Sequence, residues 1–473
     1  MEPTELSALH LARLIRSGQV SARDVVEAHI AVMRRIQPRI NPLAAERYDR
    51  ARAEADAADA KRAAAATPDA LPPLLGVPCT IKESLALTGM PNSAGLVSRR
   101  GVRAEGNAPV VQRILDAGAI PLGVTNTAEL CMWIETDNRL YGRTGNAYDP
   151  RRTAGGSSGG EGAAIGSGAA PFGLGSDLAG SIRLPAFFNG VFGHKATAGL
   201  VPNTGEFPSG PPREGRLVSK GPLARRAEDL MPILRIIAGP DGRDDFVRPL
   251  SLGDPAAVSF TGLRVLVSEK FTRMRLDPKL LAARERAAGA LAAAGAKVAS
   301  VELRDLRRAA VLYLAALDEV TDEGLQDVIT ANGSAPVTVR TALRRGGPHT
   351  LPTLLQVFAE RVPASERART RALAAGNALV DEMAGMIGDG VLLHPPYPVP
   401  APRHGATVRR PFALMTTAVF NLLGVPATVV PLGLGPDGLP LGVQVAAAPR
   451  NDHLTIAVAL ELERALGGWT PPR

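Results

Sequence analysis

The stretch from Ala154 to Thr197 constrains the fold of this chain more than any other part of the sequence. It is dense in glycine and serine, but isoleucine, leucine and phenylalanine are interleaved along it, which makes it too apolar for a flexible linker. Glycine at this density inside apolar sequence indicates backbone that lies close to other atoms. We therefore expect the stretch to be buried, and two motifs within it are candidates for chemistry.

Short apolar runs alternate with helical segments on both sides of this stretch, which is typical of βαβ units and of an α/β fold. The runs expected as strands are 75–81, 120–124, 263–267, 297–303, 425–431 and 439–446, and the expected helices include 108–117 and 280–294. With 473 residues, the length alone would allow about three domains.

The first 66 residues are rich in alanine, arginine and glutamate, and we expect them to form helices. Thr4 is a candidate N-cap for the first helix, which is expected to stop at Gly18. The second helix is expected to begin at Ser21, with Asp24 as its capping-box partner, and to end before Pro38. These helices should clamp a core that is built from later parts of the chain.

Composition excludes several classes of protein. A hydrophobic share of 45% and a charged share of 21% are ordinary for a globular protein and exclude a disordered or collagen-like one. The two cysteines, Cys79 and Cys131, are too few for a disulfide framework or a four-cysteine zinc site, and they favour a reducing compartment. The arginines behind the net charge of +8 are spread along the chain, and an aromatic share of 4% offers few platforms for stacking bases. We therefore expect no nucleic-acid partner.

The sequence also predicts a cytoplasmic protein without a membrane anchor. The amino terminus carries Glu2 and Glu5, and it has neither the basic region nor the apolar region of a secretory signal. The apolar stretches near 162–182 and 422–448 are interrupted by aspartate or proline, so we expect no transmembrane helix in either.

The first candidate motif is the run GGSSGG at 155–160, which contains the pattern G-x-S-x-G around Ser157. A nucleophile elbow of this pattern would place the serine between a strand and a helix, with an acid and a histidine later in the chain. The histidine could be His394, His404 or His453. Because catalytic triads assemble in space, the sequence separations between Ser157 and these histidines do not decide whether they form one. The alternative is a glycine-rich turn whose hydroxyl groups are all hydrogen-bonded.

The second candidate motif is the run GSDLAGSIR at 175–183. Small residues before Ser181 allow successive backbone N–H groups to point into one concavity, which is how an oxyanion site is built from main chain. A tight turn without a catalytic role is the alternative.

The third candidate is Lys82, which follows the apolar run GVPCTI at 76–81. The chain has seven lysines and otherwise uses arginine for its positive charge. A buried lysine can give up its proton and act as a base, whereas arginine cannot. The alternative is a lysine that extends its charged end to solvent.

Together, the three candidates resemble the amidase signature family. The runs GGSSGGEG at 155–162 and GLGSDLAGSIRLP at 173–185 resemble the signature itself. The separations are also similar to those of that family, with 75 residues between Lys82 and Ser157 and 24 residues between Ser157 and Ser181.

The resemblance extends over about 75–225 and resumes in the tail at 420–426 and 437–444. The runs most similar to the fatty-acid amide hydrolase type 2 branch are ELCMW at 129–133, YGR at 141–143 and FFNGVFGHK at 187–195. The resemblance implies an α/β fold with a large mixed β-sheet core that is covered by helices on both faces. It implies one amidase signature domain over 67–473, a helical segment 1–66 that packs on it, and a variable substrate-pocket region at about 305–385.

The resemblance implies a Ser-Ser-Lys triad in which Ser181 is the nucleophile, Ser157 is a bridging acid/base and Lys82 is the terminal base. No histidine is required if a neutral lysine acts through a second hydroxyl group. The Gly156–Ser157 peptide would be cis, and an acyl-enzyme would form without a metal or an organic cofactor.

In the family, four backbone N–H groups that end at the nucleophile bind the oxyanion. In this chain they belong to Leu178, Ala179, Gly180 and Ser181. The chain departs from the family at Ala179, where glycine is usual, and a methyl group there would strain the turn if φ were positive.

Supporting residues are expected around the triad and in the substrate pocket. Residues expected to form hydrogen bonds around the triad are Ser158, Ser176, Asp177 and Arg183. Residues expected to line the pocket are Met132, Trp133, Phe207 and Tyr313.

These expectations describe an amidohydrolase, a monomer or a homodimer, that cleaves linear carboxamide C–N bonds of a hydrophobic acyl or aryl amide. The same acyl chemistry would accept esters or carbamates, so a urethanase-like activity is an open variant. The main alternative is the A subunit of a tRNA-dependent amidotransferase, which uses the same triad to release ammonia from glutamine, although Glu161 argues against it. An α/β-hydrolase that uses Ser157 with a tail histidine, and a non-catalytic binding protein, also stay open.

Overall fold

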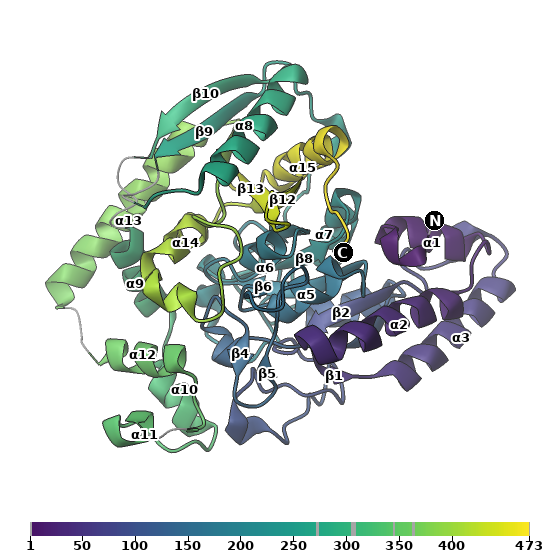
Figure 1. Ribbon diagram of the computed structural model, residues 1–473, viewed down its shortest axis with the longest axis horizontal. Helices are drawn as coiled ribbons and strands as arrows, with labels where there is room; N and C mark the ends of the chain where they lie inside the picture. The colour runs from purple at the N-terminus through teal and green to yellow at the C-terminus, as the bar shows by residue number, and fades with distance from the viewer. Residues whose placement is uncertain (1, 271–273, 304–308, 344–345, 362–364, 473) are drawn as a thin grey trace.

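The core of the protein is a sheet of eleven strands (Figure 1). The computed structural model describes residues 2–270, 274–303, 309–343, 346–361 and 365–472. The strands of the sheet are β1 (Leu43–Glu46), β2 (Pro78–Lys82), β3 (Ile120–Thr125), β6 (Phe172–Asp177), β7 (Phe192–Lys195), β8 (Ser219–Ala224), β9 (Arg264–Lys270), β10 (Lys297–Glu302), β11 (Val391–His394), β12 (Ala427–Leu434) and β13 (Pro440–Ala447). The short strands β4 (Asp137–Asn138) and β5 (Gly142–Arg143) form a separate pair.

The strands lie in the order β1-β3-β2-β6-β8-β7-β12-β13-β11-β9-β10. Strand β2 is parallel to both β3 and β6, whereas β8 is antiparallel to β6 and to β7. The sheet is therefore mixed, which confirms the predicted α/β class.

Helices cover the sheet. They are α1 (Ala8–Arg16), α2 (Ala22–Ile40), α3 (Tyr48–Ala64), α4 (Pro109–Asp116), α5 (Gly159–Gly166), α6 (Arg183–Phe188), α7 (Leu230–Ile237), α8 (Pro278–Ala293), α9 (Ala309–Val320), α10 (Leu325–Ala331), α11 (Val339–Leu343), α12 (Leu351–Glu360), α13 (Glu366–Ile387), α14 (Met415–Leu422) and α15 (Asp452–Leu466). Successive side chains along a strand point to opposite faces of the sheet, and they contact different helices on the two faces. Val265 packs in one apolar cluster with residues of α8 and α15, whereas its neighbour Leu266 packs in another with residues of α9, α13 and α14.

The amino-terminal helices differ in detail from the prediction. The N-cap of α1 is Ser7, whose hydroxyl oxygen accepts from His10 N at 3.0 Å, and not Thr4. Ser21 caps α2 as predicted, but α2 continues through Pro38 to Ile40. Burial explains the continuation, because Ile36 and Ile40 extend the apolar face of the helix into the core. Strand β1, which the helical composition did not indicate, lies between α2 and α3 and pairs with β3.

The glycine-dense stretch is buried, as predicted, and two close approaches show why glycine is needed there. A methyl group on Gly156 would lie 2.6 Å from the carbonyl oxygen of Trp133. At Gly180, where φ is +123°, a methyl group would lie 2.3 Å from Thr417 Oγ1. Any side chain at either position would collide with a neighbouring segment.

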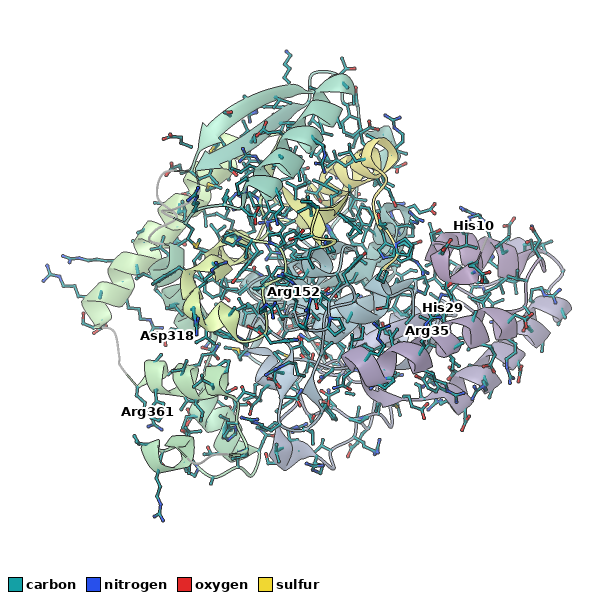
Figure 2. The ribbon with its side chains drawn as sticks, in the orientation of Figure 1. His10, His29, Arg35, Arg152, Asp318 and Arg361 are labelled. Carbon is teal, nitrogen blue, oxygen red and sulfur yellow. The ribbon has the colours of Figure 1, made fainter. Side chains whose placement is uncertain are left out.

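The two ends of the molecule in Figure 2 carry different elements. His10 and His29 mark the amino-terminal helices on one side, and Asp318 and Arg361 mark α9 and the end of α12 on the other. None of the helices in the described ranges combines the length and the apolarity that a membrane span requires.

Candidate active site

The sheet brings the three candidate residues together from separate elements. Lys82 is the last residue of β2, Ser157 precedes α5, and Ser181 lies in the turn between β6 and α6. Because β2 and β6 are adjacent and parallel, both strands end at the same edge of the sheet. All three residues are buried.

Lys82 and Ser157 are in direct contact. Lys82 Nζ lies 2.7 Å from Ser157 Oγ, and the Gly156–Ser157 peptide is cis, as the family resemblance implied. The Ser157 carbonyl oxygen accepts from Ala128 N at 3.1 Å, from Thr127 Oγ1 at 2.9 Å and from Thr136 Oγ1 at 3.1 Å. These bonds fix the loop that presents the Ser157 hydroxyl group to the lysine.

Ser181 is connected to the same loop through its backbone. Its carbonyl oxygen accepts from Ser158 N at 3.2 Å, and Ser158 Oγ donates to the Ser176 carbonyl oxygen at 3.4 Å. Among the residues that the structure describes, the Ser181 hydroxyl group has no hydrogen-bond partner and makes no bond to Ser157. The structure thus pairs the lysine with one serine and leaves the other serine open.

Asp177 and Arg183 hold the turn that carries Ser181. Arg183 donates from Nε and Nη2 to the two carboxylate oxygens at 3.0 and 2.9 Å, and both side chains are completely buried. Burial alone would raise the pKa of Asp177, but Arg183 holds it far below its usual range. The same carboxylate accepts from Gly180 N at 2.6 Å and from Ile182 N at 3.1 Å, so it organises successive backbone groups of the turn.

This turn changes the expected oxyanion hole in one respect. Gly180 N–H is already donated to Asp177, whereas the N–H groups of Leu178, Ala179 and Ser181 have no acceptor within the described residues. Ala179 does not adopt a positive φ, so its methyl group causes no backbone strain. Its carbonyl oxygen accepts from Thr417 Oγ1 at 2.6 Å.

A second buried charge network touches Lys82, and the sequence did not reveal it. Lys82 Nζ donates to Ser176 Oγ at 2.8 Å, and Ser176 Oγ donates to Glu206 Oε1 at 2.5 Å. Glu206 Oε2 accepts from Lys220 Nζ. The small number of lysines could have drawn attention to Lys220, which is one of seven. However, Lys220 is brought close to Lys82 only by the pairing of Ser176 with Lys220 across β6 and β8.

The residues expected to line the pocket lie at two polar contacts and in one apolar cluster. Tyr313 donates from its hydroxyl group to the Leu178 carbonyl oxygen at 3.0 Å, which brings α9 against the turn. Met132 and Phe207 pack in a cluster with residues of α10 and α12. Trp133 Nε1 donates to Thr407 Oγ1 at 3.1 Å.

Within the described part of the chain, none of the three tail histidines is hydrogen-bonded to Ser157 or Ser181. His394 Nδ1 lies 2.8 Å from Ser268 Oγ, and His404 Nε2 lies 3.0 Å from the Pro150 carbonyl oxygen. His453 lies against Gly253. The partner that the structure gives to the Ser157 hydroxyl group is a lysine, which does not support the nucleophile-elbow alternative.

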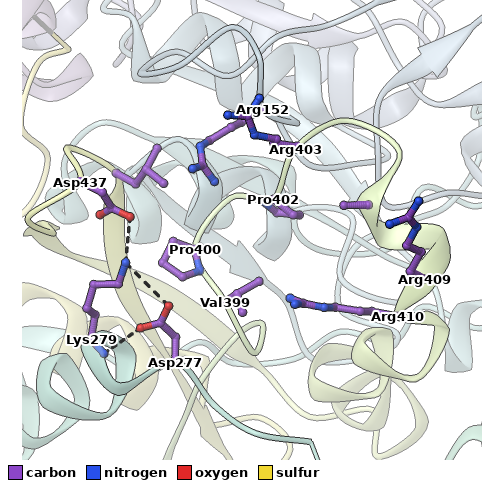
Figure 3. Close-up of a pocket in the computed structure, with 12 residues that line it drawn as sticks. Arg152, Asp277, Lys279, Val399, Pro400, Pro402, Arg403, Arg409, Arg410 and Asp437 are labelled. Atoms are coloured by element: carbon purple, nitrogen blue, oxygen red, sulfur yellow. Dashed lines mark hydrogen bonds and ion pairs between the residues drawn. The ribbon is translucent and has the colours of Figure 1, made fainter.

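A basic cavity of about 470 Å³ lies elsewhere (Figure 3). Its basic lining residues are Arg152, Lys279, Arg403, Arg409 and Arg410. Lys279 Nζ lies 2.8 Å from Asp437 Oδ2 and 3.7 Å from Asp277 Oδ2. None of the candidate catalytic residues lines this cavity.

Comparison with known proteins shows the family of this chain. The amidase family model matches residues 24–456. Fatty-acid amide hydrolase 2 from Homo sapiens is 40% identical and covers 99% of this chain and 90% of its own length. The A subunit of the glutamyl-tRNA(Gln) amidotransferase from Synechococcus sp. (strain WH7803) is 32% identical, with 95% of each chain covered. The structure of 6-aminohexanoate cyclic dimer hydrolase superimposes with a TM-score of 0.84 at 28% identity, over 99% of each chain.

Proposed function

Since this chain belongs to the amidase signature family and is a hydrolase of amide carbon–nitrogen bonds, we propose that it cleaves linear carboxamides with a hydrophobic acyl or aryl part. The observation that carries the proposed mechanism is the contact of 2.7 Å between Lys82 Nζ and Ser157 Oγ in a buried setting. A neutral lysine can act as a base, and this contact places the Ser157 hydroxyl group where Lys82 can accept its proton.

In the proposed reaction, Ser181 Oγ attacks the amide carbonyl carbon while its proton passes to Ser157 and the Ser157 proton passes to Lys82. The oxyanion is bound by the free N–H groups of Leu178, Ala179 and Ser181. Removing one donor from such a site typically costs about 10²–10³ in kcat.

Collapse of the tetrahedral intermediate breaks the C–N bond, and the leaving amine takes the proton that Ser157 returns from Lys82. Water then attacks the acyl-enzyme through the same relay and releases the carboxylic acid. Protons and bonds balance without a metal or an organic cofactor.

The surroundings of the turn support an apolar substrate. Leu178 and Ala179 are partly exposed and pack against the cluster that contains Tyr313 and Met415, so the acyl side of the turn is lined by carbon. The name of the human relative, a fatty-acid amide hydrolase, agrees with this chemistry. Esters and carbamates share the acyl group that is attacked, so we include a urethanase-like activity in the proposal.

We give less weight to a role in an amidotransferase. Glutamine is polar, whereas the groups beside the turn are apolar, and identity to the amidotransferase relative is 32% against 40% for the fatty-acid amide hydrolase. Glutamine hydrolysis that depends on a co-purifying partner protein would revive this alternative.

The test is a hydrolysis screen over fatty amides, aryl amides, anilides and carbamates, with Ser181→Ala as the blank. A fluorophosphonate probe, followed by peptide mass mapping, reports the nucleophile. The proposal expects hydrolysis of at least one apolar amide by the unmodified enzyme and an adduct on Ser181. An adduct on Ser157, or equal turnover by the Ser181→Ala variant, would overturn it.

A further inference from the structure

Glu206 is a buried carboxylate held between two lysines, and the mechanism above does not use it. Its side chain is 9% exposed, Lys82 Nζ lies 3.9 Å from Oε1, and Lys220 Nζ donates to Oε2. The backbone of Glu206 forms an antiparallel bridge with Leu85, three residues beyond Lys82. The carboxylate is therefore built into the wall of the site by the chain itself.

The contacts of Glu206 determine which atom is the donor in the hydrogen bond between Lys82 and Ser176. Its Oε1 atom accepts from Ser176 Oγ at 2.5 Å and from Ser84 Oγ at 2.9 Å. A serine hydroxyl group has one proton, and an ionised carboxylate can only accept. Ser176 therefore has no proton left for Lys82, and it can only accept from Lys82 Nζ, at 2.8 Å.

This direction constrains the lone pair of the lysine. A neutral amine has two N–H groups and one lone pair, and one N–H group is committed to Ser176. The Glu206 carboxylate, on the same side, attracts the N–H groups and repels the lone pair. The lone pair is then directed to the other neighbour of Nζ, the Ser157 hydroxyl group at 2.7 Å, which is the proton donor of the relay.

Lys220 explains how a carboxylate can lie so close to a base. An unpaired negative charge near Lys82 would favour the ammonium form, which cannot take up a proton. Lys220 is 2% exposed on its side chain and also donates to Asn203 Oδ1 at 2.8 Å. The positive charge of Lys220 offsets the negative charge of Glu206. The Glu206 carboxylate still accepts the hydrogen bond from Ser176 Oγ.

We propose that Glu206 and Lys220 form a positioning pair, which acts through Ser176 to turn the lone pair of Lys82 toward Ser157. The inference rests on the proposed Ser-Ser-Lys mechanism. Glu206 is hydrogen-bonded to Ser176 rather than to Lys82, and Lys220 acts through Glu206.

Other charged groups near Lys82 belong to different elements. Glu161 of α5 accepts from Thr80 Oγ1 and Thr125 Oγ1, and burial raises its pKa to about 8. Burial alone would also raise the pKa of Glu206, but the positive charge of Lys220 holds it below its usual range. Glu206 is thus the ionised carboxylate near Lys82 at neutral pH, and Lys220 is its counter-charge.

The experiment measures the rate at which a fluorophosphonate labels Ser181 in the full chain, from pH 5 to pH 10. In Glu206→Gln, we expect the amide oxygen to accept from Lys220, so that the amide N–H₂ group donates to Ser176. Ser176 would then donate its own proton in a hydrogen bond to Lys82. Labelling should slow by roughly tenfold or more. The acid limb of the profile should move to lower pH, because the negative charge beside the base is lost.

The double variant Glu206→Gln/Lys220→Met separates positioning from packing. Without Lys220, the amide oxygen can face Ser176 again, so labelling should return to within about threefold of the unmodified rate. A packing defect would instead make the double variant slower than Glu206→Gln. The matched control is Glu463→Gln, whose carboxylate accepts from Ala227 N and contacts none of these residues.

Ser176→Ala gives a second test of the positioning role. If Glu206→Gln fails to fold, Ser176→Ala removes only a hydroxyl group and should slow labelling by a similar factor. Unchanged labelling and an unmoved acid limb in Glu206→Gln, or in Ser176→Ala, would overturn the positioning role while leaving the triad intact. Absence of any adduct on Ser181 in the unmodified enzyme would instead overturn the proposed function, and the positioning role with it.

Discussion

The turn at Ser181 and helix α9, which contacts it, are built in different ways. In the turn, Asp177 and Arg183 are completely buried and form an ion pair. On α9, Val311 and Leu314 are each 61% exposed, and Tyr313 donates a hydrogen bond from its hydroxyl group to the turn. The difference indicates that bond cleavage depends on a rigid polar core, whereas the adjoining helices can change without disturbing it.

The largest expected effect tests the chemistry of the core. Ser181→Ala should lower hydrolysis of the best amide found in the screen by roughly 10⁴-fold or more, because the proposed nucleophile is lost. Its circular dichroism and thermal unfolding should match those of the unmodified enzyme. Residual turnover above a tenth of the original would show that another group performs the attack.

The next effect concerns the stability of the core. Arg183→Met leaves the buried Asp177 carboxylate without its partner, which should lower the free energy of unfolding by about 3–5 kcal/mol. Urea unfolding followed by tryptophan fluorescence measures the loss. Arg464→Met removes an exposed arginine that pairs with Glu461 and should leave the unfolding free energy unchanged. Equal losses in both variants would show that the buried pair contributes no more to stability than an exposed pair does.

A smaller effect depends on pH. Burial raises the pKa of Glu161 to about 8, so the folded state keeps a proton that the unfolded chain releases near the ordinary glutamate value of 4.5. The free energy of unfolding should therefore fall as pH rises from about 4.5 to about 8, by a few kcal/mol at most, and then level off. Glu161→Gln should flatten this dependence in urea unfolding at pH 5, 7 and 9. Parallel curves for the two proteins would show that Glu161 is ionised throughout.

The smallest effect should come from the helices. Tyr313→Phe removes the hydrogen bond to the Leu178 carbonyl oxygen and should lower the unfolding free energy by about 1 kcal/mol. The kcat for a small amide should stay within about threefold, whereas KM for long-chain amides should change more. Tyr148→Phe removes a comparable bond to the Thr470 carbonyl oxygen and serves as the control. A large loss of kcat in Tyr313→Phe alone would place α9 within the catalytic machinery.

Local patterns predicted the parts of the site that short-range chemistry determines. The density of glycine predicted the buried backbone at 154–197. The resemblance of the motifs around Lys82 and Ser157 to one family predicted that these two residues act together. The course of α2 through Pro38 was mispredicted, because burial of Ile40 outweighs the local preference of proline to end a helix.

Long-range register supplied what the sequence patterns missed. Glu206 directly precedes Phe207, which was expected to line the pocket, but no local feature marked Glu206 as a neighbour of Lys82. Its place depends on the bridge to Leu85 and on the pairing of Ser176 with Lys220, both of which join residues far apart in the chain. A carboxylate with such partners can be recognised only after the strands are paired.

The position of β12 and β13 has a consequence for how the enzyme is made. These strands come late in the chain, yet they lie in the middle of the sheet, between β7 and β11. Arg183, which holds the turn of Ser181, donates to Thr417 O at 3.0 Å, to Asn421 Oδ1 at 2.5 Å and to Gln444 Oε1 at 3.1 Å. A chain still emerging from the ribosome therefore carries Ser181 long before it has the residues that brace Arg183 and the turn. We expect hydrolytic activity to appear only after nearly the whole polypeptide has been synthesised.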